Sequence, residues 1–192
     1  EYRPDSHADL RIGRLLEGYE FNGQKIAPRL HLVSMYTDQV PASDLSRPMA
    51  ARHSFRICPT VAEALTLGTG KLAVDGVILI GEHGRYARNE KGQTKYPRYE
   101  FWKEIVKVFE ASGKAVPVFN DKHLSWNWDW AKAMVDTAAS MSFPLMAGSS
   151  LPVTWRMAPS VCTFTSEQFY EGKLTPRPEL AQQRLTGTDG LD

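Results

Sequence analysis

The fold of this chain is decided by the stretch Val116-Pro-Val-Phe-Asn-Asp-Lys-His-Leu-Ser125. A short apolar run ends abruptly in four polar residues, and a segment with helical periodicity follows at once. Apolar runs of this length, bounded by turn residues and followed by a helix, are typical of buried strands in a parallel α/β sheet. Because ligands bind beyond the carboxyl ends of such strands, we expect the chemistry of the protein at residues 120–123.

The same alternation of strand and helix runs along most of the chain. Further strands are predicted at residues 30–36, 55–58, 74–80 and 143–148, and helices at residues 7–17, 44–52, 61–65, 101–110 and from 126 onward. Predicted N-caps are Ser6 for the first helix, Ser43 or Asp44 for the second, Thr60 for the third and Ser125 for the last. The alternation predicts an α/β fold, a Rossmann-like three-layer sandwich with a mostly parallel sheet.

Composition narrows the classes of partner. The net charge is +1 and the basic residues are scattered, which is not the footprint of a nucleic-acid-binding protein. The longest apolar runs, such as Val77-Ile-Leu-Ile80, are far too short to cross a bilayer. Cys58 and Cys162 are too few for a disulfide framework or a cysteine metal site. We therefore expect a small-molecule substrate and neither nucleic acid nor membrane, with homo-oligomerisation left open.

The two ends of the chain differ in character. It begins Glu1-Tyr2 without a signal-peptide pattern, so we expect a cytoplasmic protein whose N-terminus is processed or starts within a longer frame. Beyond about Met157 the strand–helix pattern fades into a proline-rich tail. We predict a domain over residues 1–156 and an extended arm over residues 157–192. Residues 85–99, polar and rich in Gly, Pro and Tyr, are predicted to form a surface loop beside a strand end.

Polar side chains follow the predicted strands directly. They are Asp38, Glu82, His83, Asp121, Lys122 and His123, and His7 and Asp9 are expected beside them. Because the carboxyl ends of parallel strands meet at one edge of a sheet, these groups should converge. Imidazole, carboxylate and ammonium groups perform acid–base chemistry or bind divalent metals. No pair of histidines has the spacing that places two metal ligands on one helix, so no metal residues are assigned.

Three stretches, one of which overlaps Val116–Ser125, occur in the same order as similar stretches in a known family. They are Val74-Asp-Gly-Val-Ile-Leu-Ile-Gly81, Gly113-Lys-Ala-Val-Pro-Val-Phe-Asn-Asp-Lys-His123 and Phe143-Pro-Leu-Met-Ala-Gly148. Over about residues 30–156 the chain resembles the nucleotide-binding domain of the Gfo/Idh/MocA oxidoreductases. The resemblance implies a Rossmann-like domain and an NAD(P)-dependent oxidoreductase, or a fragment of one, that acts on a sugar-like or polyol-like substrate.

The resemblance also implies roles for individual residues. Lys122 matches the family lysine near nicotinamide and substrate, so it would assist proton transfer, and His83 or His123 would contact the substrate. Asp38 would hold the cofactor ribose. Ser6, His7, Gly81 and Asp121 complete the predicted site for NAD or NADP.

Two departures from the family pattern keep other functions open. The Gly-rich turn that cradles a pyrophosphate is replaced by a segment with Pro4 and His7, and the first strand of the sheet is missing. The second, substrate-holding domain of the family has no counterpart in these residues. The alternatives are a cofactor-free binding or partner protein on the same scaffold, and a metal-dependent lyase, isomerase or hydrolase.

Overall fold

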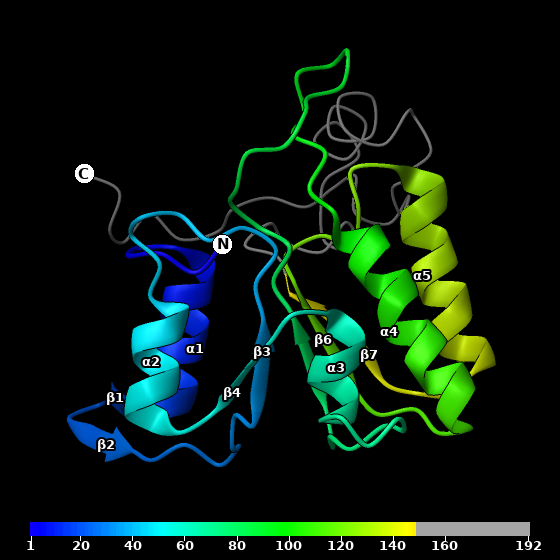
Figure 1. Cartoon of the computed structure of the whole chain (residues 1–192). Coiled ribbons are helices and arrows are strands. Elements are labelled where there is room, and N and C mark those ends of the chain that lie inside the picture. The colour runs from blue at the N-terminus through cyan, green and yellow to red at the C-terminus, as the bar shows by residue number, and fades with distance from the viewer. Residues whose placement is uncertain (149–192) are drawn as a thin grey trace, which may run out of the picture.

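The computed structural model describes residues 1–148, which form an α/β fold (Figure 1). Its helices are α1 (His7–Glu17), α2 (Ser46–His53), α3 (Val61–Thr66), α4 (Arg98–Ser112) and α5 (Trp128–Ser140). Its strands are β1 (Tyr19–Phe21), β2 (Gln24–Ile26), β3 (Ser34–Tyr36), β4 (Arg56–Cys58), β5 (Val77–Leu79), β6 (Val118–Asp121) and β7 (Leu145–Gly148). The predicted arm at residues 157–192, and Cys162 within it, lie outside the described residues.

The strands pair into three small sheets. Strand β6 lies between β5 and β7 and is parallel to both, with Val118 opposite Val77 on one side and Leu145 on the other. Strands β3 and β4 form a second parallel pair, in which Met35 lies opposite Ile57. The prediction of parallel strands is confirmed. Within residues 1–148, however, they form two parallel sheets where the alternation predicts one, and β1 and β2 form a separate antiparallel hairpin.

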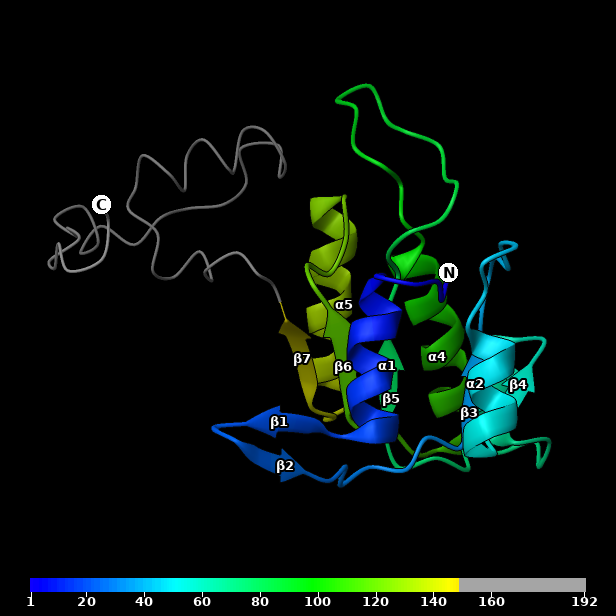
Figure 2. The ribbon, with the colours of Figure 1, turned by 90° about the vertical axis from the view of Figure 1, so that its left-hand side faces the viewer.

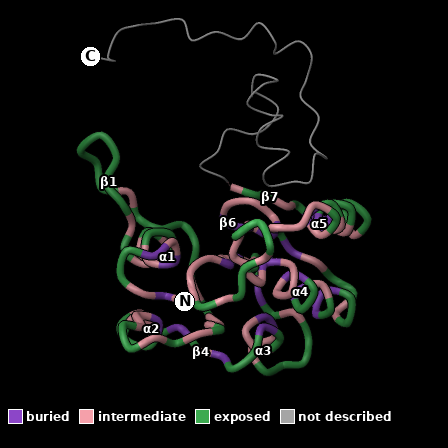
Figure 3. The backbone as a smooth tube through the Cα atoms, turned by 90° about the horizontal axis from the view of Figure 1, so that it is seen from above, coloured by how far each residue is buried: buried purple, intermediate pink, exposed green. Residues whose placement is uncertain are grey.

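Helices cover the strands on both sides. Helices α1 and α2 lie on one side, and α3, α4 and α5 lie on the other (Figures 1 and 3). The β1–β2 hairpin extends sideways from the end of α1 (Figure 2). The parallel strands β3 to β7 are thus held between two helical layers, and their carboxyl ends lie on one side of the molecule.

Two clusters of buried side chains hold these layers together. The larger one joins α3, α4 and α5 to β5 and β6, and at its centre the rings of Phe109 and Phe143 pack edge to face with centroids 5.2 Å apart. The smaller one is built on Tyr2, Ala8 and Ile12, against which residues of α2 and β3 pack. Each cluster lies on its own side of the strands, so the core of the described chain has two parts.

Two of the four predicted N-caps, Ser6 and Thr60, are confirmed. The hydroxyl oxygen of Ser6 accepts a hydrogen bond from the amide of Asp9, at 3.2 Å, and that of Thr60 accepts one from Glu63, at 3.0 Å. Gly113, with φ of +61°, ends α4 in the left-handed conformation that favours glycine. These local signals could be read correctly because each depends on residues within one turn of the helix.

One predicted N-cap is wrong and another is displaced by one residue. Helix α5 is capped by Asn127, whose side chain accepts from the Trp130 amide, and Ser125, three positions before the helix, accepts from the Asn127 amide. Helix α2 begins after Leu45, which has no side-chain cap. Asp44, two positions before this helix, accepts from the Arg47 backbone amide at 3.3 Å and from the Ser46 hydroxyl, so it binds a donor of the first turn as predicted.

Some element boundaries also differ from the sequence prediction. The strands predicted at residues 30–36 and 74–80 are shorter, at Ser34–Tyr36 and Val77–Leu79, and α4 begins at Arg98, inside the predicted loop of residues 85–99. The β1–β2 hairpin was not predicted. Its turn is Asn22-Gly23, with φ of +51° and +73°, and an Asn-Gly pair is a strong hairpin signal that the sequence contains.

The cap of α1 gives a first prediction. Ser6 is fully buried, and its hydroxyl oxygen also accepts from the Arg3 amide. The substitution Ser6→Ala should lower the free energy of unfolding by about 1–2 kcal/mol, because two backbone donors lose their acceptor. Urea denaturation of this variant, beside Ser140→Ala at the exposed end of α5, measures the effect. Equal losses in the two variants would contradict the assigned cap.

Candidate functional site

Strand β6 positions the centre of the candidate site. Asn120 and Asp121 at its carboxyl end are fully buried, and Lys122 turns the chain with φ of +67°. The Asn120 side-chain amide donates to the backbone carbonyls of the turn, including that of His123 at 3.1 Å. The left-handed backbone conformation is unfavourable for lysine and persists only where other contacts fix it. Here the hydrogen bonds of Asn120 fix the turn. The turn therefore presents Lys122 and His123 in a fixed arrangement.

Asp121 brings helix α1 against this strand end. One of its carboxylate oxygens lies 2.6 Å from His7 Nδ1, and the other lies 3.2 Å from Arg11 Nε. His7 and Arg11 are four residues apart and share one face of the helix. A fully buried carboxylate is stable only when its oxygens are paired, so Asp121 fixes the position of both side chains.

A second carboxylate, Glu82, gathers residues from β5, α4 and the β6 turn. It follows β5 and pairs with the Arg98 guanidinium and with Lys122 Nζ, the latter at 3.4 Å. Arg98 is fully buried, and its Nη1 lies 3.3 Å from His123 Nε2. A Cβ atom at Gly81 would lie 2.5 Å from Arg98 Cγ, so only glycine at this position leaves room for the Arg98 side chain.

His83 shows two features that are uncommon in one residue. Its backbone has φ of +62°, and its Nε2 is buried without a hydrogen-bond partner within residues 1–148. Its Nδ1 lies 3.3 Å from Arg3 Nη2, and its ring centroid is 5.6 Å from that of His7. Backbone strain and an unpaired buried nitrogen both concentrate at functional sites.

These contacts define what we call the strand-end cluster. Its members are Arg3, His7, Arg11, Glu82, His83, Arg98, Asp121, Lys122 and His123. The structure brings together most of the residues that the sequence assigned to the site. Sequence reasoning missed the three arginines. The i, i+4 spacing from His7 could have suggested Arg11, but no local signal identifies Arg3 or Arg98, because their partners are distant in the chain.

The three remaining residues of the predicted site, Ser6, Gly81 and Asp38, lie outside the strand-end cluster. Ser6 caps α1, and Gly81 packs on Arg98. Asp38 follows β3, and its carboxylate accepts hydrogen bonds from the hydroxyls of Tyr36, at 2.9 Å, and Tyr86, at 2.8 Å. Burial raises the pKa of Tyr36 to about 12, and the bond to Asp38 adds to the effect. Asp38 therefore belongs to a neighbouring group with the two tyrosines.

Two histidines of the cluster, His83 and His123, are held neutral. Burial, followed by the neighbouring Arg98 charge, lowers the pKa of His123 to about 4. Burial and Arg3 also lower the pKa of His83. Neutral imidazole keeps one nitrogen as a proton acceptor and one as a donor. Arg3 donates to His83 Nδ1 and Arg98 donates to His123 Nε2, so the other nitrogen of each ring carries the proton and acts as a hydrogen-bond donor.

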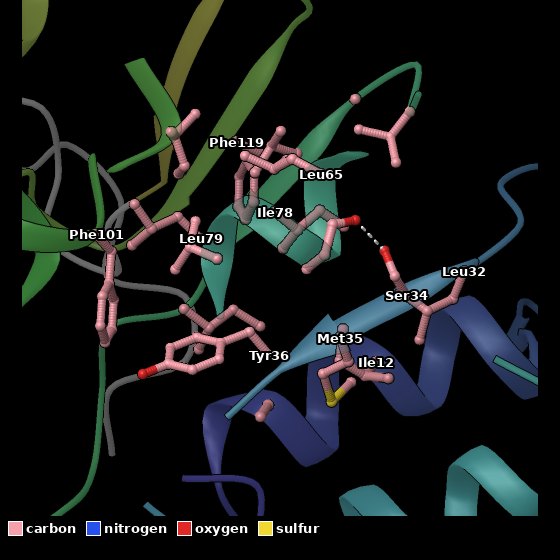
Figure 4. Close-up of a pocket in the computed structure, with 18 of the residues that line it drawn as sticks. Ile12, Leu32, Ser34, Met35, Tyr36, Leu65, Ile78, Leu79, Phe101 and Phe119 are labelled. Carbon is pink, nitrogen blue, oxygen red and sulfur yellow. Dashed lines mark hydrogen bonds between the residues drawn. The ribbon is translucent and has the colours of Figure 1, made fainter. Parts of the chain in front are cut away.

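Two cavities adjoin the cluster. The smaller, of about 170 Å³, is lined by His7, Leu10, Arg11 and Arg14, and we call it the α1 pocket. The larger, of about 880 Å³, lies between β3 and β5 and reaches Asp38 and Glu82 at the strand ends (Figure 4). We call it the β3–β5 cavity. The α1 pocket is cationic, whereas most side chains drawn around the β3–β5 cavity are apolar.

The start of α1 does not offer a pyrophosphate the usual backbone donors. The amide of Asp9 is bonded to Ser6, and the amide of Asp5 is bonded to Asp9 Oδ2 at 3.1 Å. The carboxylates of Asp5 and Asp9 also stand where a helix N-terminus favours an anion. This arrangement disfavours a dinucleotide in the position that the resemblance implies.

Comparisons with known proteins assign no relative to the chain: no family model, curated protein or solved structure matches it. The resemblance to the Gfo/Idh/MocA oxidoreductases thus stays a prediction. In the part of the chain that the structure describes, no three His, Cys, Asp or Glu residues are grouped closely enough to hold a metal ion. No helix of that part is long and apolar enough to cross a membrane.

The low pKa of His123 makes stability depend on pH. The unfolded chain protonates this histidine near pH 6.5 and the folded chain only near pH 4, so the unfolded state binds the proton first as the pH falls. Stability should therefore drop by up to about 3 kcal/mol between about pH 6.5 and pH 4 because of this one group. The variant His123→Gln should lose that part of the pH dependence in urea denaturation series.

His31, which is exposed, provides the matched control. The variant His31→Gln should keep the full pH dependence of the original chain. If His123→Gln and His31→Gln follow the same curve, His123 is not held neutral by its surroundings.

Proposed function

We propose that the strand-end cluster binds a small, anionic, hydroxyl-bearing molecule and transfers a proton on it. The observation that carries this proposal is that two cationic side chains of the cluster are more exposed to solvent than its carboxylates. The side chains of Arg11 and Lys122 are 47% and 27% exposed, whereas those of Asp121 and Glu82 are 0% and 12% exposed. A molecule that arrives from solvent therefore meets cations first, and cations attract an anionic ligand.

The α1 pocket suits the anionic group of such a ligand. Its three polar side chains, His7, Arg11 and Arg14, lie along one face of α1. Guanidinium groups bind carboxylate or phosphate through paired hydrogen bonds. The buried carboxylate of Asp121 pairs with Arg11 Nε and His7 Nδ1. The terminal nitrogens of the Arg11 guanidinium can then donate to the ligand.

Proton transfer falls to Lys122 and His7. Lys122 is partly exposed and is oriented by Glu82, so its ammonium group can donate a proton to a substrate oxygen. His7 donates through Nδ1 to Asp121, which leaves its Nε2 to accept a proton from the substrate.

His83 is neutral, and because its Nδ1 accepts from Arg3, its Nε2 carries the proton and can donate to a hydroxyl group. His123 lies behind Arg98 and acts as a positioning residue. This set supports an isomerase or lyase reaction at a carbon next to a carbonyl group.

The scaffold is part of the same proposal. We propose that the parallel strands and their two helical layers are a Rossmann-like three-layer sandwich. In open parallel sheets, ligands bind beyond the carboxyl ends of the strands. The strand-end cluster lies at that edge, where β5, β6 and the start of α1 meet.

Deuterium exchange tests the proton transfer. The chain is incubated in D₂O with D-gluconate, D-glucuronate and, as the uncharged comparison, D-glucose, and deuterium at carbon is followed by NMR. We expect incorporation into a sugar acid and not into glucose. The substitution Lys122→Met should slow it by about 10²–10⁴-fold, because the positioned proton donor is lost.

Lys132 on α5 provides the matched control, since it is 61% exposed and pairs only locally with Asp136. The variant Lys132→Met should exchange at the original rate. Equal exchange in the two lysine variants, or none with any sugar acid, would contradict the proposal.

An NAD(P)-dependent oxidoreductase is the second candidate. It is supported by Asp38 at the end of β3 and Lys122 at the end of β6, which are the positions that the resemblance implies for ribose and nicotinamide contacts. Asp38→Ala should weaken NADPH or NADH binding by about tenfold or more in calorimetry, because hydrogen bonds to a charged group are lost. The variant Asp136→Ala should leave it unchanged. The absence of heat with either dinucleotide at millimolar concentration would remove this candidate.

A further inference from the structure

Strands β3 and β5 lie on opposite sides of the β3–β5 cavity and do not pair with each other. Residues 29–38 line one wall and residues 73–82 line the other. Figure 4 shows Met35 and Ile12 at one side of this space and Leu65, Ile78 and Phe119 at the other. The cavity is therefore flanked by two strands and lined on its other sides by residues of α1, α3 and α4.

Within residues 1–148, no strand pairs with the edges of β3 and β5 that border the cavity. The Arg56 amide of β4 donates to the Val33 carbonyl at 3.0 Å, so Val33 directs its backbone groups toward β4. Successive residues of a strand direct these groups to opposite edges, which turns Ser34 and Tyr36 toward the cavity. On the other wall, the Val77 amide donates to Pro117 at 2.9 Å, which turns Ile78 toward the cavity.

The side chains of both walls are also less buried than those of central strands. All three residues of β3 are half-buried, and only Leu79 of β5 is fully buried. Val33, just before β3, is 38% exposed, and Leu30 is 64% exposed. Central parallel strands are normally covered on both faces. In the part of the chain that the structure describes, these apolar side chains and strand edges lack the neighbour that a strand between them would supply.

We propose that the β3–β5 cavity receives a β-strand of about six apolar, mainly β-branched residues that runs parallel to β3 and β5 and continues directly into Glu1. The path of residues 1–3 along the cavity is the observation that favours this occupant. Glu1 and Tyr2 line the cavity, and the Tyr2 carbonyl accepts from the Leu45 amide at 2.8 Å, which anchors the chain there. Arg3, the next residue, contacts His83 at the carboxyl end of β5.

A strand that ends at this point must run in the same direction as its neighbours. Its carboxyl end meets Glu1 at the carboxyl ends of β3 and β5, and the chain then enters α1 through a short turn. This is the strand–turn–helix order of a βαβ unit. Six residues at about 3.3 Å each give a strand of about 20 Å, a common length for a strand in a globular protein. The two parallel sheets then become one, in the order β4, β3, the added strand, β5, β6 and β7.

Amide hydrogen exchange of an N-terminal fusion tests the proposal. The segment Met-Lys-Val-Ile-Val-Ile-Val-Thr is joined to Glu1 of the full 192-residue chain, and exchange is followed by NMR. The amides of Ser34, Tyr36 and Ile78 should exchange on the order of 100-fold more slowly in the fusion than in the unfused chain, because they gain strand partners. The Lys132 amide, inside α5, should not change.

A control fusion carries Met-Lys-Val-Pro-Val-Pro-Val-Thr, in which proline removes the donors of the added segment and prevents central pairing. In this control fusion, the amides of Ser34, Tyr36 and Ile78 should exchange at the same rate as in the unfused chain. Two results would overturn the proposal: equal protection in both fusions, or full protection of these amides in the unfused chain. Protection by the free Val-Ile peptide added to the unfused chain, without protection in the fusion, would also overturn it, since the strand must then come from another molecule.

Discussion

The pairing of β6 with two parallel neighbours is the constraint on which the rest of the structure depends. It sets Asn120 opposite Leu79 and Ala147, so β5 and β6 end at the same level. The residues that follow these strands, Glu82 and Lys122, then lie close enough to contact each other. Parallel pairing is what turns two separate segments of sequence into one site.

Buried carboxylates then draw the helices onto this edge. Glu82 and Asp121 would each be costly to bury alone, and each is paired with groups from a different helix. Asp121 fixes the first turns of α1, and Glu82 fixes the start of α4 through Arg98. The same interactions that keep these charges inside the protein therefore set the positions of the cationic side chains near solvent.

The sequence predicts those features that depend on short-range patterns. The apolar run before Asn120 predicts β6, Ser6 and Thr60 predict helix starts, and the order of strands and helices predicts that polar residues gather at one edge. The contacts of Arg3 and Arg98 could not be predicted, because their partners His83 and His123 lie 80 and 25 residues away in the chain. Side-chain packing selects such pairs, and no periodicity reports them. The β1–β2 hairpin is different, since the Asn22-Gly23 pair that indicates its turn can be read directly from the sequence.

The central claim is that the strand-end cluster is one assembled site for a small anion. NMR titration of the full chain with D-gluconate, with D-glucose as the uncharged comparison, tests it most directly. The account predicts saturable shifts of the Arg11 and Lys122 amides and of the His7 and His83 imidazoles, all with one dissociation constant and only with gluconate. Shifts confined to other surfaces, or the same response to glucose, would contradict it.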